Sequence, residues 1–199
     1  PRTWIRAALL AVPVVATQVV LSQLQAGLGL HPFSAAVAQE KKAPDTRETR
    51  RTPALRNNVY EQLSKAQEAA EAKDLSGAAS ILDAMIASGG KSALNSYELA
   101  NVYNLYAFIY YSREDYAKAL KAYEEVVAQP DIPLAMEINT KYTIAQLYFV
   151  QEQWQKGIDA LLGWFALTDK PNANAYILLA QGYYQVEDYN KALVNVEKA

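Results

Sequence analysis

The heptapeptide EDYAKAL at residues 114–120 returns as EDYNKAL at residues 187–193, and a looser version, EQWQKGI, occupies residues 152–158. The aromatic residues of the three segments are Tyr116, Trp154 and Tyr189, which lie 38 and then 35 residues apart. A period of this length indicates that the chain is built from similar supersecondary units that stack on one another.

A helical pattern precedes each aromatic residue. Apolar or small side chains recur there at positions i, i+3, i+4 and i+7, which is the spacing of one face of an α-helix. The three sets are Tyr103, Tyr106, Ala107 and Tyr110; then Ile144, Ala145 and Tyr148, with Lys141 in the first position; then Tyr176, Leu179, Ala180 and Tyr183.

A second helix is predicted after each aromatic residue. It carries a small residue that lets two helix backbones approach, and a large residue four positions later. Asp115 and Asp188 stand where an N-cap is needed to satisfy the free amides of this second helix. Prolines at 130, 133 and 171 end the units, since proline cannot continue a helix. The small and large pairs are Ala119 with Tyr123, Gly157 with Leu161, and Ala192 with Val196.

A helix–turn–helix unit of roughly 34 residues with this pattern resembles the tetratricopeptide (TPR) repeat. The resemblance implies an all-α solenoid of about three and a half repeats, stacked with a right-handed superhelical twist. We assign a degenerate capping unit to residues 58–90 and repeats to 98–133, 138–171 and 173–199. The last repeat stops inside its second helix, so Leu193 and Val196 would lack a following hairpin to cover them. We expect the chain to be a fragment, or this end to be covered by a partner or another copy.

The N-terminal part is predicted to direct export. Arg2 and Arg6 precede an apolar run at 7–21, and Ala36-Val37-Ala38 supplies the small residues of a cleavage site before Gln39. We therefore predict a signal peptide at 1–38 and a periplasmic location; the alternative is an uncleaved membrane anchor. Residues 39–57 are basic and poor in large apolar side chains, which predicts a disordered linker.

Composition excludes several kinds of site. The chain has no cysteine, and its one histidine, His31, lies in the segment that we expect to be removed. Ser-His-Asp and Cys-His catalysis and ordinary zinc sites are therefore not expected, nor is a cofactor. The net charge of −2 does not favour nucleic-acid binding. We predict a protein that is not an enzyme.

A second stripe on the first helices is the candidate peptide-binding groove. In known TPR arrays these positions line the concave surface, so this placement comes from the resemblance. Side-chain amides can pair with a peptide backbone, while aromatic rings can cover apolar side chains. The alternative is that the tyrosines serve packing alone. The predicted groove residues are Asn101, Asn104, Phe108, Tyr111, Asn139, Tyr142, Gln146, Phe149, Asn174, Gln181 and Tyr184.

Three stretches also resemble exported TPR proteins that accompany TonB energy-transduction systems of Gram-negative bacteria. They read RRTPALRNNVYEQLSKAQEAAEAKDLSGAASILD, LNSYELANVYNLYAFIYYSREDYAKALKAYEEVV and YTIAQLYFVQEQWQKGIDALLGWF. The resemblance implies a periplasmic scaffold that holds an extended segment of a partner protein. Two other functions stay open: a structural homo-oligomer formed through the last repeat, and a docking arm of an enzyme whose catalytic domain lies outside this chain.

Overall fold

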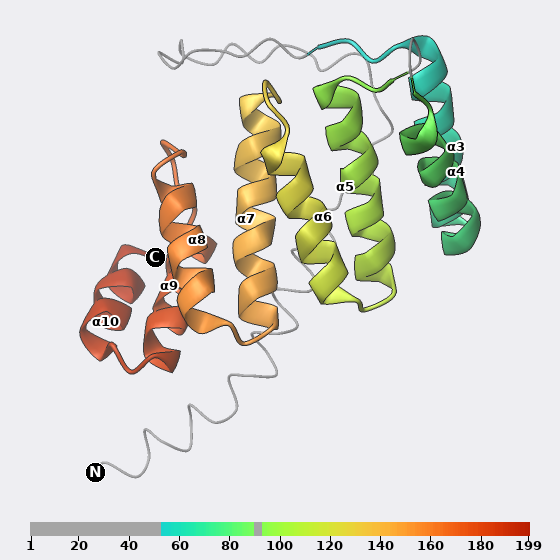
Figure 1. Cartoon of the computed structure of the whole chain (residues 1–199). Coiled ribbons are helices and arrows are strands. Elements are labelled where there is room, and N and C mark those ends of the chain that lie inside the picture. Colours follow the sequence, from blue (N-terminus) through green and yellow to red (C-terminus); the bar gives the residue numbers. More distant parts are fainter. Residues whose placement is uncertain (1–52, 90–92) are drawn as a thin grey trace.

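The computed structural model describes residues 53–89 and 93–199, and these residues form helices and no strand (Figure 1). The prediction of an all-α fold is confirmed for this part of the chain. The helices pair into four antiparallel hairpins. The hairpins are α3 (Asn57–Glu71) with α4 (Leu75–Ala87), α5 (Ser96–Ser112) with α6 (Tyr116–Ala128), α7 (Leu134–Val150) with α8 (Trp154–Phe165), and α9 (Ala173–Gln185) with α10 (Tyr189–Lys198).

The hairpins are stacked in chain order, from the α3–α4 hairpin at one end to the α9–α10 hairpin at the other (Figure 1). The second helix of each hairpin contacts the first helix of the next one, as α6 contacts α7 and α8 contacts α9. One core cluster runs from α3 to α7, and another joins α7, α8 and α9. No single hairpin covers its own apolar side chains, so each depends on its neighbour.

The four hairpins share one turn geometry. In the second hairpin the N–H of Asp115 donates to the carbonyl of Tyr110 at 2.9 Å, and the N–H of Glu114 donates to the carbonyl of Tyr111. This is the Schellman pattern of a helix C-terminus, and it places one residue in the left-handed region. The same two hydrogen bonds recur in the other three turns. The left-handed residues are Lys73 (φ 64°), Glu114 (φ 59°), Glu152 (φ 57°) and Glu187 (φ 63°).

The second helices begin where the sequence predicts. Tyr116, Trp154 and Tyr189 are the first residues of α6, α8 and α10. The Asp115 carboxylate accepts the N–H of Lys118 at 3.1 Å, and Asp188 does the same for Lys191 at 3.2 Å, which confirms both N-caps. Asp74 caps α4 in the same way, while α8 has no side-chain cap.

Phe149 fills a slot that two glycines create. A Cβ atom on Gly157 of α8 would lie 2.8 Å from the ring of Phe149, and one on Gly182 of α9 would lie 2.6 Å from it. Atoms cannot approach this closely, so both positions need glycine for the ring to stay where it is. The phenyl ring of Phe149 therefore fills the space where α7, α8 and α9 meet.

The boundary of the first hairpin differs from the prediction. The linker was predicted to extend to residue 57, but α3 begins at Asn57, and Arg56 is held by contacts to α5. The predicted signal peptide at 1–38 and the linker as far as residue 52 lie outside the described residues.

Candidate peptide-binding face

The polar part of the predicted groove is exposed on three successive first helices. Asn104 of α5, Asn139 of α7 and Asn174 of α9 are all exposed. Their side-chain amides make no hydrogen bond to other residues of the described ranges. Asn101 differs, because it is half-buried and its amide donates to the carbonyl of Tyr97 at 2.7 Å. Three asparagine amides are thus available to an incoming ligand.

Three predicted groove residues are buried, which corrects their assignment. Tyr111, Gln146 and Phe149 each expose less than a tenth of their surface. The ring of Phe149 occupies the slot beside the two glycines, and Tyr111 belongs to the core cluster that joins α3 to α7. Gln146 lies on α7, which has a hairpin on each side. These three side chains pack inside the stack and offer no surface to a ligand.

Three aromatic residues of the predicted groove, Tyr111, Phe149 and Tyr184, make packing contacts at the hairpin turns. Each lies against the aromatic residue that begins its own second helix. Tyr184 stays exposed because no described helix covers the end of the last hairpin. The ring centroids are 5.5 Å apart for Tyr111 and Tyr116, 6.2 Å for Phe149 and Trp154, and 5.4 Å for Tyr184 and Tyr189.

Three further members of the predicted groove are half-buried. The ring of Tyr142 rests on Trp164 of α8, with centroids 4.8 Å apart, and burial raises the pKa of the Tyr142 hydroxyl. Phe108 packs against the core with part of its ring exposed. The amide of Gln181 makes no hydrogen bond within the described ranges. The rings of Tyr142 and Phe108 are thus packed on one side and open on the other, as a preformed binding surface requires.

We define the amide face as the predicted groove residues that keep exposed surface and no internal hydrogen bond. It contains no Lys, Arg, Asp or Glu, so any ligand that it binds must be recognised by neutral hydrogen bonds and apolar contact. Its members are Asn104, Phe108, Asn139, Tyr142, Asn174, Gln181 and Tyr184.

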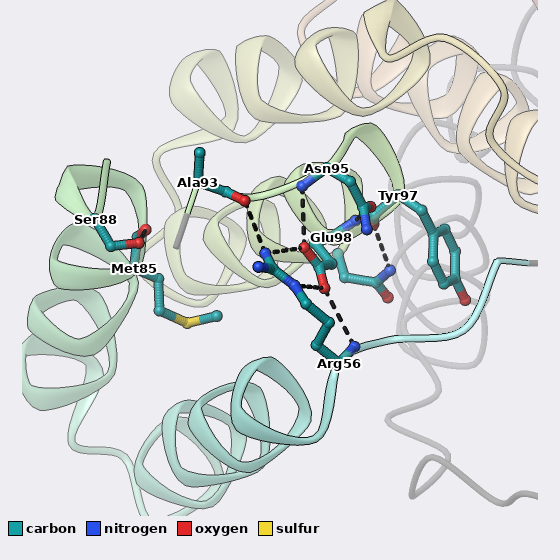
Figure 2. Close-up of polar contacts among 8 residues, drawn as sticks. Arg56, Met85, Ser88, Ala93, Asn95, Tyr97 and Glu98 are labelled. Carbon is teal, nitrogen blue, oxygen red and sulfur yellow. Dashed lines mark hydrogen bonds and ion pairs between the residues drawn. The ribbon is translucent and has the colours of Figure 1, made fainter. Parts of the chain in front are cut away.

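An ion pair between the first two hairpins was not predicted. Figure 2 shows Arg56, the N-cap residue of α3, reaching the carboxylate of Glu98 in the first turn of α5. The Nε and Nη2 atoms of Arg56 donate to the two carboxylate oxygens at 2.9 and 2.6 Å. The backbone N–H groups of Arg56 and Asn95 donate to the same carboxylate, which is fully buried. The guanidinium of Arg56 lowers the pKa of Glu98, and the buried charge is thereby satisfied.

Half of this ion pair could have been found in the sequence. Asn95 and Glu98 form a capping box, since the Asn95 side chain accepts the N–H of Glu98 at 2.9 Å, and N-x-x-E is its signature. The arginine lies 42 residues before its partner, and no local pattern links positions so far apart.

A pocket of about 540 Å³ lies between α3 and α4, away from the amide face. Val59, Ile81, Met85 and Leu94 form most of its apolar wall. In the second hairpin the equivalent space is filled by a cluster of Ala100, Val126 and Ile132. The pocket therefore reflects looser packing of the first hairpin, and none of the predicted groove residues lines it.

Neither a metal site nor a membrane span is found in the described part of the chain. No group of three or more His, Cys, Asp or Glu residues there could hold a metal ion. None of its helices is both long and apolar enough to cross a bilayer. No protein-family model and no curated protein matches the chain.

Proposed function

We propose that the protein is a non-enzymatic scaffold that binds an extended segment of a partner protein along the amide face. The observation that carries this proposal is the presence of an exposed asparagine with a free amide on each of three successive first helices, Asn104, Asn139 and Asn174. An asparagine side chain offers both a donor and an acceptor, so it can pair with the peptide groups of a ligand of any sequence. Amides on three successive helices can pair with separate peptide groups of one extended chain.

The half-buried rings supply the apolar part of this recognition. Tyr142 is held in place by Trp164, so little side-chain entropy is lost when a ligand packs on it. Phe108 and Gln181 occupy equivalent positions on α5 and α9, and both are partly exposed. We infer that preferred ligands carry small or apolar side chains and little charge.

The experiment is a selection followed by titration. Peptides are selected from a displayed random library against the full chain, and their affinities are measured for a variant with Asn104, Tyr142 and Gln181 changed to Ala. Loss of three contacts should weaken binding by at least about tenfold, because each lost hydrogen bond contributes on the order of 1 kcal/mol.

The matched control changes three exposed residues on second helices, Lys121, Glu125 and Asn190, to Ala. It removes as many side chains and leaves the net charge unchanged. If both variants bind the selected peptides equally well, the amide face is not the binding surface.

We also propose that the hairpins are TPR repeats and that the protein acts in the periplasm beside a TonB-type transport system. The shared turn geometry and the small–large pattern of the second helices support the repeat type.

The arginines before the apolar run and the Ala36-Val37-Ala38 motif support export, and the three resembling stretches support the link to TonB. N-terminal sequencing of protein recovered from a Gram-negative periplasm should give Gln39 first. Recovery of the uncut chain in the membrane fraction would instead indicate an anchor.

A further inference from the structure

The pocket between α3 and α4 has an apolar, uncharged lining. Val59 and Met85, which are 3% and 6% exposed, form its most buried part, and Ile81 and Leu94 complete the apolar wall. Among the described residues, no Lys, Arg, Asp or Glu lines it. Its volume of about 540 Å³ lies within the range of ligand-binding pockets, roughly 300–1,000 Å³. A ligand group that enters it must therefore be apolar and uncharged.

The same space in the second hairpin is filled by the protein itself. Ala100 of α5 stands where Val59 stands in α3, counted back from the N-cap of the following helix. Val126 of α6 corresponds in the same way to Met85. Both Ala100 and Val126 pack against Ile132, which is 1% exposed and comes from the connection between α6 and α7. A branched aliphatic side chain thus fills the second hairpin at the place where the first has a pocket.

Two differences in sequence account for the pocket. Leu94 is the only large apolar residue of the connection at 88–95, and it forms part of the pocket wall. Gln62 stands where α5 has Tyr103, and the ring of Tyr103 packs against the cluster that contains Ile132. The first hairpin therefore has the surroundings of a buried aliphatic side chain and does not supply that side chain from its wall.

Two free amides lie beside the pocket. Asn58 and Gln62 line it, follow the spacing i and i+4 on α3, and are exposed. Their side chains make no hydrogen bond to other residues of the described ranges. Such an amide can accept from a peptide N–H group and donate to a peptide carbonyl. The two amides therefore suit the backbone of a segment whose side chain enters the pocket.

We propose that the pocket binds one branched aliphatic side chain of an uncharged segment of a partner protein. The side chain takes the place that Ile132 takes in the second hairpin, and the amides of Asn58 and Gln62 hold the backbone that carries it. This site lies away from the amide face. It is a second contact with a partner, and it does not depend on the groove proposed above.

The first test uses the two methionines of the chain, Met85 in the pocket and Met136 beside its filled counterpart. In the full chain, labelled with carbon-13 at the methionine methyl groups, N-acetyl-isoleucine amide should shift the Met85 signal and leave the Met136 signal in place. N-acetyl-alanine amide should bind at least about tenfold more weakly, because it has three fewer carbons to bury and each is worth roughly a factor of four. A Met85 signal that does not respond, or two signals that move alike, overturns the proposal.

The second test fills the pocket. Gln62→Tyr adds the ring that Tyr103 supplies in the second hairpin, so it should abolish the response of Met85 and raise the unfolding temperature. The control is Glu61→Tyr, which changes an exposed neighbour on α3 that does not line the pocket and should leave the response intact. If Gln62→Tyr binds the isoleucine probe like wild type, the probe binds elsewhere and the pocket is not the site.

The third test asks whether the occupant is a peptide segment. Acetyl-Ser-Ile-Ser amide should bind about tenfold more tightly than sec-butanol, which carries the same aliphatic group without a peptide backbone. Changing Asn58 and Gln62 together to Ala should remove this difference. If the alcohol binds the wild type as tightly as the peptide does, the pocket takes a small apolar molecule and the proposed segment is wrong.

Discussion

Replacing Phe149 with Ala should destabilise the protein more than any other single change on the predicted groove. The ring is 5% exposed and lies in the slot made by Gly157 and Gly182, so the substitution leaves a cavity that helix backbones line. Large-to-small substitutions of buried phenylalanine cost about 3–5 kcal/mol of unfolding free energy. The equivalent residue of the next hairpin, Tyr184, is 40% exposed, and its ring packs against Tyr189. Tyr184→Ala should therefore cost only about 1 kcal/mol, the worth of one aromatic pair.

A double-mutant cycle with Gly157 tests the slot itself. Gly157→Ala alone should cost about 1–3 kcal/mol, because the added methyl group meets the ring. In the Phe149→Ala background the ring is absent, and the same substitution should stabilise α8 by about 1 kcal/mol, the helix propensity gained over glycine.

Urea unfolding followed by circular dichroism gives the four free energies. If Gly157→Ala has the same sign in both backgrounds, the ring does not occupy the space that the glycine leaves. If Phe149→Ala costs no more than Tyr184→Ala, then Phe149 is a surface residue, as the sequence predicts, and is not part of the core.

Three further predictions concern single contacts. The pKa of Glu98 is lowered by its guanidinium partner, so the ion pair stabilises the fold fully above the unfolded pKa of about 4.3 and is lost as the pH falls through the lower folded pKa. The loss of thermal stability caused by Glu98→Gln, measured by differential scanning calorimetry, should therefore shrink below about pH 4; a constant difference down to pH 2 would show that the carboxylate charge is irrelevant. Asn172→Ala removes the side-chain cap of α9 and should cost about 1 kcal/mol in urea unfolding, while Asn190→Ala, which removes no cap, should change little. Glu152→Gly should stabilise by about 0.5 kcal/mol, since glycine avoids a left-handed penalty of roughly 1–2 kcal/mol and loses roughly 0.5–1 kcal/mol of backbone entropy. Glu125→Gly, inside a helix, should instead destabilise by about 1 kcal/mol in the same assay, and stabilisation at both positions would contradict the role given to the turn.

Local sequence patterns predict the helices and their starts well. The aromatic residues at 116, 154 and 189 each begin a helix, and the aspartates at 115 and 188 cap two of them. These features depend on residues within one turn of each other, so a single sequence contains the information. The exposure of Leu193 and Val196 was also predicted, because the repeat pattern shows which stripe needs a neighbour.

The binding face is predicted less well. The helical period shows on which side of a helix a residue lies, but it does not show how much of that residue the neighbouring helices cover. Phe149 and Tyr184 occupy the same repeat position, yet one is buried and the other exposed. The difference arises because α9 of the following hairpin lies against Phe149, with Gly182 making room for the ring, whereas no described helix follows the hairpin of Tyr184. A residue's environment in a stacked fold depends on the next repeat as much as on its own.

The ion pair between Arg56 and Glu98 also affects which hairpin of the stack unfolds first. It ties the start of α3 directly to α5, so the first hairpin is held to the rest by more than its contact through α4. Among the described residues, no ion pair joins the last hairpin to α7 or α8, and the apolar side chains Leu193 and Val196 of α10 are exposed. Backbone amides of α10 should therefore exchange with deuterium sooner than those of α3. On heating, the last hairpin should unfold before the first.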